Sequence, residues 1–275
     1  MRLHGSPLIR NLELKFFGWF GLIMHSKLFW IVLGLKVIAS FMFGSPVLTE
    51  LFIPFAEEFV ARPFENTYDT FWDLGMDQSF PYPAVMLWVI SLPRLMLYWV
   101  GFHDLEFNIL IFVYRLPLIV ADLAIFMVLC RWLKKKISLL VWLYWASPVL
   151  FFITYVHGQL DVIAMCFAFL STYFLFSNRW LHSAILLALA IGAKMHLLLV
   201  LPFALVYLWQ NYRRLRTPFL FFLIVCCVFL ILNLPYIFGN GFMQMVLFNA
   251  QQEKVGMIII NSQIDGVVFH IIPAL

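Results

Sequence analysis

Charged residues are scarce in this chain. Asp, Glu, Lys and Arg make up 12% of its 275 residues, whereas hydrophobic residues make up 64%. A soluble domain is about half apolar and about a quarter charged, so this composition excludes an ordinary soluble domain. The 31 Phe and 10 Trp would also carry more apolar surface than one core could hide. The composition therefore predicts an all-α, multi-pass membrane protein with the bilayer as its solvent.

Several motifs of soluble enzymes are missing. The chain has no Walker-type glycine loop, no zinc-ligand spacing and no dinucleotide-binding fingerprint, so nothing supports a cytoplasmic nucleotide site. We recognise no cleavable signal peptide, because the first strongly apolar run starts late and lacks a small-residue cleavage site. The few cysteines all fall in apolar segments, which favours small buried side chains over a disulfide framework. They are Cys130, Cys166, Cys226 and Cys227.

Long apolar runs are the strongest feature that is present. A helix needs about 20 predominantly apolar residues to cross a bilayer. Residues 182–209 could form one tilted span or a hairpin of two, and the basic segments on either side favour the hairpin. We predict seven crossings, at residues 28–46, 107–130, 137–156, 162–177, 182–194, 196–209 and 218–236.

The distribution of charge predicts the orientation. Residues 1–27, 131–136 and 210–217 are rich in Lys and Arg, which marks them as cytoplasmic. Residues 44–106 carry nine acids against two Arg and are therefore expected outside, as a long acidic first outer loop. We expect a bacterial inner membrane, with the active site facing outwards.

Four segments complete this topology. Residues 8–24 mix charged and apolar side chains and suit an interfacial helix. Residues 83–101 are interrupted by Pro93 and Arg94, so we place them as a helix on the outer face. Residues 237–264 lie outside. An eighth span is expected to begin near Gly266 and is incomplete, which suggests a truncated protein or a natural short form; residues 1–275 form a single transmembrane domain.

The clearest polar cluster follows the 137–156 span. His157, Gln159 and Asp161 supply an imidazole, an amide and a carboxylate within about one helical turn, and Gly158 permits a sharp turn. Such a set can hold a phosphate or sugar hydroxyls at the outer boundary of the membrane. The alternative is a polar turn satisfied by water, but so short a turn seldom needs all three groups.

Lys194 lies between apolar helices, two residues before His196. A lysine there snorkels to the interface, forms an internal ion pair or binds an anion such as a lipid-linked phosphate. We favour the phosphate and expect His196 to assist.

Three further charged positions attract attention because charges at membrane depth are costly. Arg115 and Asp122 share one face of a predicted span, where they could serve a site but better fit an ion pair with neighbours. Lys36 needs a partner, and Asp122 is a candidate.

Most acids of the outer loop should be solvated. Glu50 differs because it closely follows the first span and can face the same cavity as a general base.

The motifs resemble the glycosyltransferase C superfamily, polytopic enzymes that take sugars from polyprenyl-phosphate donors. Part of the likeness is to dolichyl-phosphate-glucose-dependent glucosyltransferases and part to the mannosyltransferase type. The stretches that carry it are Phe80–Pro83, Tyr114-Arg115 with Leu118–Leu123, Ser147-Pro148 with His157–Asp161, and Gly192–Lys194 with Leu201-Pro202.

The resemblance implies inverting transfer of a hexose to a lipid or glycan acceptor, with an acid of the first outer loop as base. The family usually has an aspartate where this chain has Glu50, so Glu57, Glu58 or Asp69 are alternatives. We expect Glu50 and Asp161 to be catalytic, no nucleotide-sugar or redox cofactor, no nucleic-acid partner, and a divalent metal only as an unsupported option. The donor is expected to contact Lys194, His157, Gln159, His196 and Arg115.

Two functions of other classes remain open. A transporter or flippase of a lipid-linked saccharide would use similar intramembrane charges, although the paired halves typical of transporters are not detected. A polysaccharide polymerase or ligase would share the outer loop and the lipid-phosphate donor.

Overall fold

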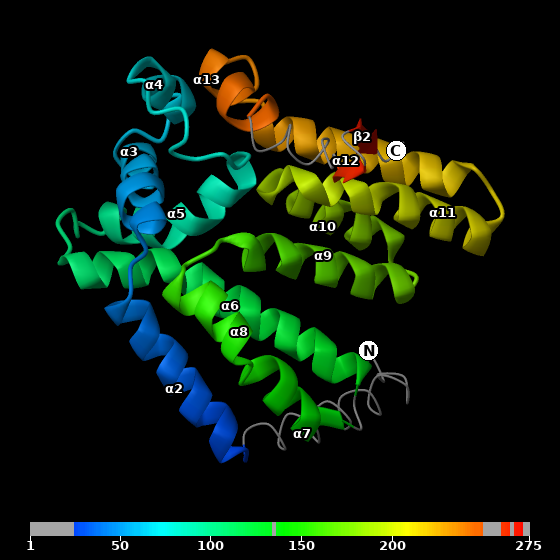
Figure 1. Ribbon diagram of the computed structural model, residues 1–275, viewed down its shortest axis with the longest axis horizontal. Helices are drawn as coiled ribbons and strands as arrows, with labels where there is room; N and C mark the ends of the chain where they lie inside the picture. Colours follow the sequence, from blue (N-terminus) through cyan, green and yellow to red (C-terminus); the bar gives the residue numbers. More distant parts are fainter. Residues whose placement is uncertain (1–24, 134–135, 250–259, 265–266, 272–275) are drawn as a thin grey trace, which may run out of the picture.

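The computed structural model describes residues 25–133, 136–249, 260–264 and 267–271. Between residues 25 and 249 the described chain is helical, as expected from its composition (Figure 1). The longer helical segments are α2 (Lys27–Met42), α6 (Phe107–Trp132), α9 (Asp161–Phe176), α10 (Trp180–Ala193), α11 (Val200–Tyr212) and α12 (Arg216–Asn233). The interfacial helix predicted at residues 8–24 lies outside the described residues.

Several of these helices are long and apolar enough to cross a membrane. Three qualify alone: α6, the continuous stretch Met195–Tyr212 formed by the 3₁₀ turn η5 (Met195–Leu199) and α11, and α12. Two bent helix pairs would raise the number to five. The helical structure is therefore consistent with a membrane protein, and the seven crossings stay a prediction.

The two bent pairs correct two predicted spans. The expected span 28–46 ends at Met42, and the chain turns by 60° before it continues as η1 (Val47–Phe52) and α3 (Ile53–Ala61). The expected span 137–156 bends by 45° at a break before Pro148. Proline cannot donate a backbone hydrogen bond, and Pro46 and Pro148 each stand where a new helical segment begins. The interruption predicted at Pro93 is wrong, because α5 (Ala84–Trp99) continues through that residue. The second pair consists of α7 (Ile137–Leu140), η3 (Val141–Trp145), α8 (Pro148–Phe151) and η4 (Phe152–Val156).

The segment 182–209 is divided into two helices, as the hairpin prediction required. Helix α10 ends at Ala193, Lys194 has an extended backbone, and η5 and α11 follow. Gly192 makes the packing at this end possible, because a Cβ there would lie 2.6 Å from the side chain of Val85. The end of α10, directly before Lys194, thereby lies close to α5 (Ala84–Trp99).

Another group of helices gathers at one end of the bundle, at the upper left of Figure 1. They are α3, α4 (Thr67–Asp73), α5 and α13 (Asn240–Phe242), and we call them the cap. Helix α13 packs tightly on α4: the Gly241 amide donates to the Asp69 carboxylate at 2.7 Å, and a methyl group at Gly241 would overlap the Tyr68 carbonyl.

A buried arginine joins two helices of the cap, and a tyrosine of α6 links them to the bundle. Arg94 is 2% exposed and binds Glu57 with two nitrogens, at 2.8 and 3.0 Å. Tyr114 of α6 donates to the same carboxylate at 2.6 Å. Paired, geometrically matched charges of this kind are tolerated where an isolated charge would not be.

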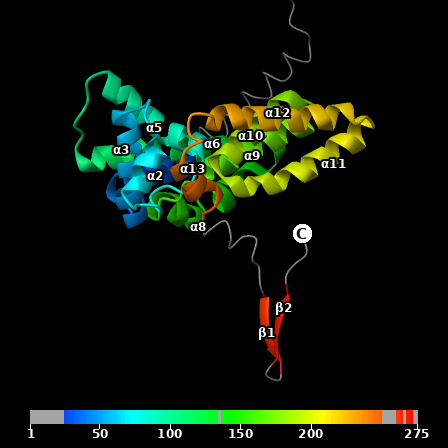
Figure 2. The ribbon, with the colours of Figure 1, turned by 90° about the horizontal axis from the view of Figure 1, so that it is seen from above.

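The eighth span that was predicted to begin near Gly266 is not present in the described part of the C-terminal segment. Strands β1 (Ile260–Ile264) and β2 (Val267–Ile271) form an antiparallel hairpin, which Figure 2 shows apart from the helices. The sequence explains why a hairpin forms here. β-branched residues favour strands, and Asp-Gly between two runs of such residues is a strong hairpin signal. Gly266 itself lies outside the described residues.

Candidate functional site

A cavity of about 290 Å³ opens beside the turn that precedes α9. Its walls come from η1, from the loop before α5 and from the residues after η4. The lining residues are Val47, Leu51, Phe52, Gln78, Pro81, Tyr82, His157, Gly158 and Gln159. Three residues of the predicted polar cluster, His157, Gly158 and Gln159, therefore lie in one wall of the cavity.

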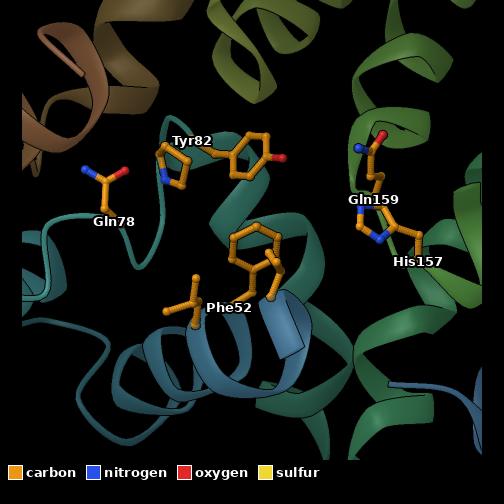
Figure 3. Close-up of a pocket in the computed structure, with 9 residues that line it drawn as sticks. Phe52, Gln78, Tyr82, His157 and Gln159 are labelled. Atoms are coloured by element: carbon orange, nitrogen blue, oxygen red, sulfur yellow. The ribbon is translucent and has the colours of Figure 1, made fainter. Parts of the chain in front are cut away.

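None of the residues that line the cavity is an Asp, Glu, Lys or Arg. In Figure 3 the Tyr82 ring lies between Gln78 on one side and Gln159 and His157 on the other, with Phe52 beneath it. Amides, an imidazole and a phenol can both donate and accept hydrogen bonds, and aromatic faces pack against apolar groups. This chemistry suits a neutral molecule with several hydroxyls.

The loop that carries Tyr82 is held from two sides. The Tyr68 hydroxyl donates to the Tyr82 carbonyl at 2.8 Å, and the Asn233 side chain accepts the Ala84 amide at 3.1 Å. These contacts come from α4 and α12, which are distant in the sequence. The position of the Tyr82 phenol is therefore a product of the tertiary structure.

Gly158 shapes the opposite wall. Its φ of +76° is unfavourable for residues with a side chain, and a Cβ there would lie 2.8 Å from Nη2 of Arg115. The turn can therefore descend onto Arg115 only because residue 158 is glycine.

Arg115 lies behind this wall and is fully buried. Its Nη1 donates to the Tyr155 carbonyl at 2.7 Å, while Nε and Nη2 have no hydrogen-bond partner. No salt bridge to a carboxylate occurs among the described residues, because Asp122 belongs to another pair. Arg115 supports the cavity wall and does not line the cavity.

Asp122 binds Lys36, the partnership that the sequence suggested. Their Oδ2 and Nζ atoms are 2.7 Å apart, and the side chains are 5% and 1% exposed. Tyr144 and Tyr155 also donate to this carboxylate, at 2.9 and 2.7 Å, and Lys36 lies 3.5 Å from the centre of the Trp145 ring. The pair is enclosed and its groups are satisfied.

A second ion pair lies near the cavity. Lys194 Nζ is 2.6 Å from Asp161 Oδ2, with side chains 30% and 36% exposed. Asp161 begins α9, where the helix dipole favours a carboxylate. The internal ion pair that the sequence left open for Lys194 is thus present, and its partner is Asp161.

Two observations connect this pair with its surroundings. Burial raises the pKa of the Tyr82 phenol above its usual range, and the negative charge of Asp161 raises it further, so Tyr82 stays a donor near neutral pH. His196 is within electrostatic range of both Lys194 and Asp161, and its Nδ1 is buried without a partner. The pair therefore adjoins the Tyr82 side of the cavity.

Glu50 has a different position. It is exposed on η1, it has no hydrogen-bond or ion-pair partner among the described residues, and it is not part of the cavity lining, although Val47 and Leu51 of the same helix are. Its alternatives are engaged: Glu57 binds Arg94, Glu58 lies 3.4 Å from Arg62, and Asp69 caps α13.

The sequence missed part of this site. Tyr82 appeared only in a motif, and nothing pointed to Gln78 or Phe52, which are brought to the cavity by the folding of the cap. Within the described residues, no group of three or more His, Cys, Asp or Glu side chains could hold a metal ion, and all four cysteines are free.

No family model, curated protein or solved structure matches this chain. The resemblance to the glycosyltransferase C superfamily therefore depends on the motifs alone.

Proposed function

We propose that this protein is a membrane glycosyltransferase that moves a hexose from a polyprenyl-phosphate donor to an acceptor hydroxyl, with inversion. The observation that carries the proposal is the Lys194–Asp161 pair beside a cavity lined by uncharged polar and aromatic side chains. Such a site offers a cation for a lipid phosphate and a neutral pocket for a sugar.

We assign each side chain of the site a role from its chemistry. Gln159, His157 and Tyr82 bind the hydroxyls of the hexose, and Phe52 packs against its apolar face. Lys194, assisted by His196, binds the phosphate, whose negative charge grows as the bond to the sugar breaks. Arg115 supports the Gly158 wall from behind. No nucleotide-sugar or redox cofactor is needed for this reaction.

Removal of the acceptor proton needs a carboxylate near the reacting carbon. Glu50 and Asp161 are the two candidates, since Glu57 is held by Arg94. In either case the acceptor oxygen attacks the anomeric carbon from the face opposite the phosphate, and the polyprenyl phosphate leaves with the bonding electrons.

The proposal includes an orientation in a bacterial inner membrane. The cap lies at one end of the bundle, whereas the connections α6–α7, α9–α10 and α11–α12 lie towards the other, at the right of Figure 1. Those connections carry the basic residues Arg131, Arg179 and Arg213. The positive-inside rule places them in the cytoplasm and the cap outside, with the seven predicted crossings between.

The test uses the full chain in lipid nanodiscs, with short-chain polyprenyl-phosphate mannose and glucose as donors and membrane lipid extract as the acceptor source. We expect sugar transfer, or slow release of free hexose to water, and a loss of about 10²-fold or more in Lys194→Gln. Arg214→Gln removes an exposed cation from a loop and serves as the matched control, with unchanged turnover.

Two outcomes contradict the proposal. Equal turnover of Lys194→Gln and the unsubstituted chain would remove Lys194 from the site. Movement of the intact donor across proteoliposomes, without cleavage, would favour the flippase.

A further inference from the structure

The cation that should bind the donor phosphate is already occupied. Lys194 Nζ lies 2.6 Å from Asp161 Oδ2, a contact as short as charged hydrogen bonds become. An incoming phosphate must therefore displace a carboxylate or share the ammonium with it. This competition is absent at Lys36, which no ligand can reach.

The pair is placed so that it can open. Both side chains are about one-third exposed, and exposed pairs contribute little to stability, so their separation costs little. The other oxygen of Asp161, Oδ1, is buried and has no hydrogen-bond partner, so the carboxylate retains a free acceptor. A carboxylate kept only to hold a lysine would be expected to use both oxygens, as Asp122 does.

We infer that the Lys194–Asp161 pair is exchanged during the reaction: the donor phosphate takes Lys194, and Asp161, once released, accepts the proton of the acceptor hydroxyl. This inference rests on the proposed function and assigns the base to Asp161. Donor binding then comes before release of Asp161 from Lys194, so the carboxylate can meet the acceptor hydroxyl only when the sugar is in place.

The atoms balance without a further reactant. The acceptor O–H proton passes to Asp161 as a bond forms between the acceptor oxygen and the anomeric carbon. The bond from that carbon to the phosphate oxygen breaks, and its electron pair leaves with the polyprenyl phosphate. The phosphate gains one negative charge, so its attraction to Lys194 is greatest when Asp161 has become neutral.

The surrounding groups support this sequence. Among the described residues, Tyr82 and His196 are two titratable groups that interact with Asp161 besides Lys194. The Tyr82 phenol can donate to the sugar or to the carboxylate, and the His196 Nδ1 atom is buried without a hydrogen-bond partner beside the pair.

The experiment compares binding with turnover in Asp161→Asn. With sugar-free polyprenyl phosphate as the probe, we expect binding about two- to fivefold tighter, because Lys194 loses its competing carboxylate. Turnover of the sugar donor should fall by about 10²- to 10⁴-fold, the usual contribution of a general base. Asp73→Asn, an exposed acid of α4, is the matched control, with both values unchanged.

The sign of the binding change separates the inference from a structural role. If Asp161 only holds Lys194 in place, its loss should weaken phosphate binding, and that result overturns the exchange. Asp161→Glu retains a carboxylate and should keep more than about one-tenth of the turnover; equal losses in Asp161→Glu and Asp161→Asn would also overturn it.

Failure of the inference differs from failure of the proposed function. Transfer by the unsubstituted chain that survives in Asp161→Asn refutes the exchange and leaves the transferase intact. A complete absence of sugar transfer or hydrolysis by the unsubstituted chain refutes both.

Discussion

The described part of the molecule contains two lysine–aspartate pairs of nearly equal length and of different character. Lys36–Asp122 is almost inaccessible and is surrounded by Tyr144, Tyr155 and Trp145. Lys194–Asp161 is about one-third exposed, adjoins the cavity and leaves one carboxylate oxygen without a partner. The contact distance does not distinguish a structural pair from a functional one; the neighbouring groups do.

The largest effect on stability should follow from breaking the enclosed pair. Asp122→Asn leaves Lys36 as a buried, unpaired cation, and we expect the free energy of unfolding in detergent micelles to fall by about 3–5 kcal/mol. The double substitution Lys36→Met with Asp122→Leu removes both charges and should recover most of that loss. A fall of less than about 1 kcal/mol in Asp122→Asn would mean that the enclosed pair is not structural.

Gly158→Ala tests the cavity wall that packs against Arg115. The positive φ should cost about 1–2 kcal/mol, and the added methyl group must push Arg115 Nη2 away. We expect lower thermal stability together with weaker binding of polyprenyl-phosphate hexose.

Gly34→Ala is the control for that substitution, because no atom lies within 4 Å of the added Cβ in the middle of α2. It should be neutral or stabilise the helix by up to about 1 kcal/mol. Similar losses from both glycine substitutions would contradict the special role of Gly158.

The smallest effect on stability should come from the pair beside the cavity. Asp161→Asn should change the free energy of unfolding by less than about 1 kcal/mol, because both partners retain contact with water. Thermal unfolding of Asp161→Asn and Asp122→Asn in parallel measures the contrast directly. Comparable destabilisation by the two would show that exposure does not separate them.

The helices of the bundle were largely predictable. Apolar runs extend over α6 and α12 with few interruptions, and the break at Lys194 was expected from the basic segments that flank it. The bends at Pro46 and Pro148 were missed as bends, because proline tells where a helix is interrupted but not whether the chain continues in the same direction.

The site was only partly predictable. His157, Gln159 and Asp161 formed a visible polar cluster in an apolar chain, and Lys194 was conspicuous for the same reason. That Lys194 meets Asp161, 33 positions earlier in the sequence, depends on how α9 and α10 pack. Glu50 looked similar to Asp161 in the sequence, yet it lies exposed on η1, outside the cavity lining.

In the C-terminal segment the type of secondary structure was predicted wrongly. An apolar composition near Gly266 suggested the start of a helix, whereas the β-branched residues of Val267–Ile271 are part of a hairpin. Hydrophobicity alone does not separate short strands from helices.

The sequence by itself determined that this chain is helical and suited to a membrane, because so few charges and so many apolar side chains leave no stable alternative in water. It also determined which polar residues are rare enough to matter. Only the tertiary structure decided which charges are paired, which oxygen of Asp161 has no hydrogen-bond partner and which loop lines the cavity. The reason is physical: ion pairs and cavities are formed by segments that are far apart in the chain, and their energies depend on burial, which the sequence does not contain.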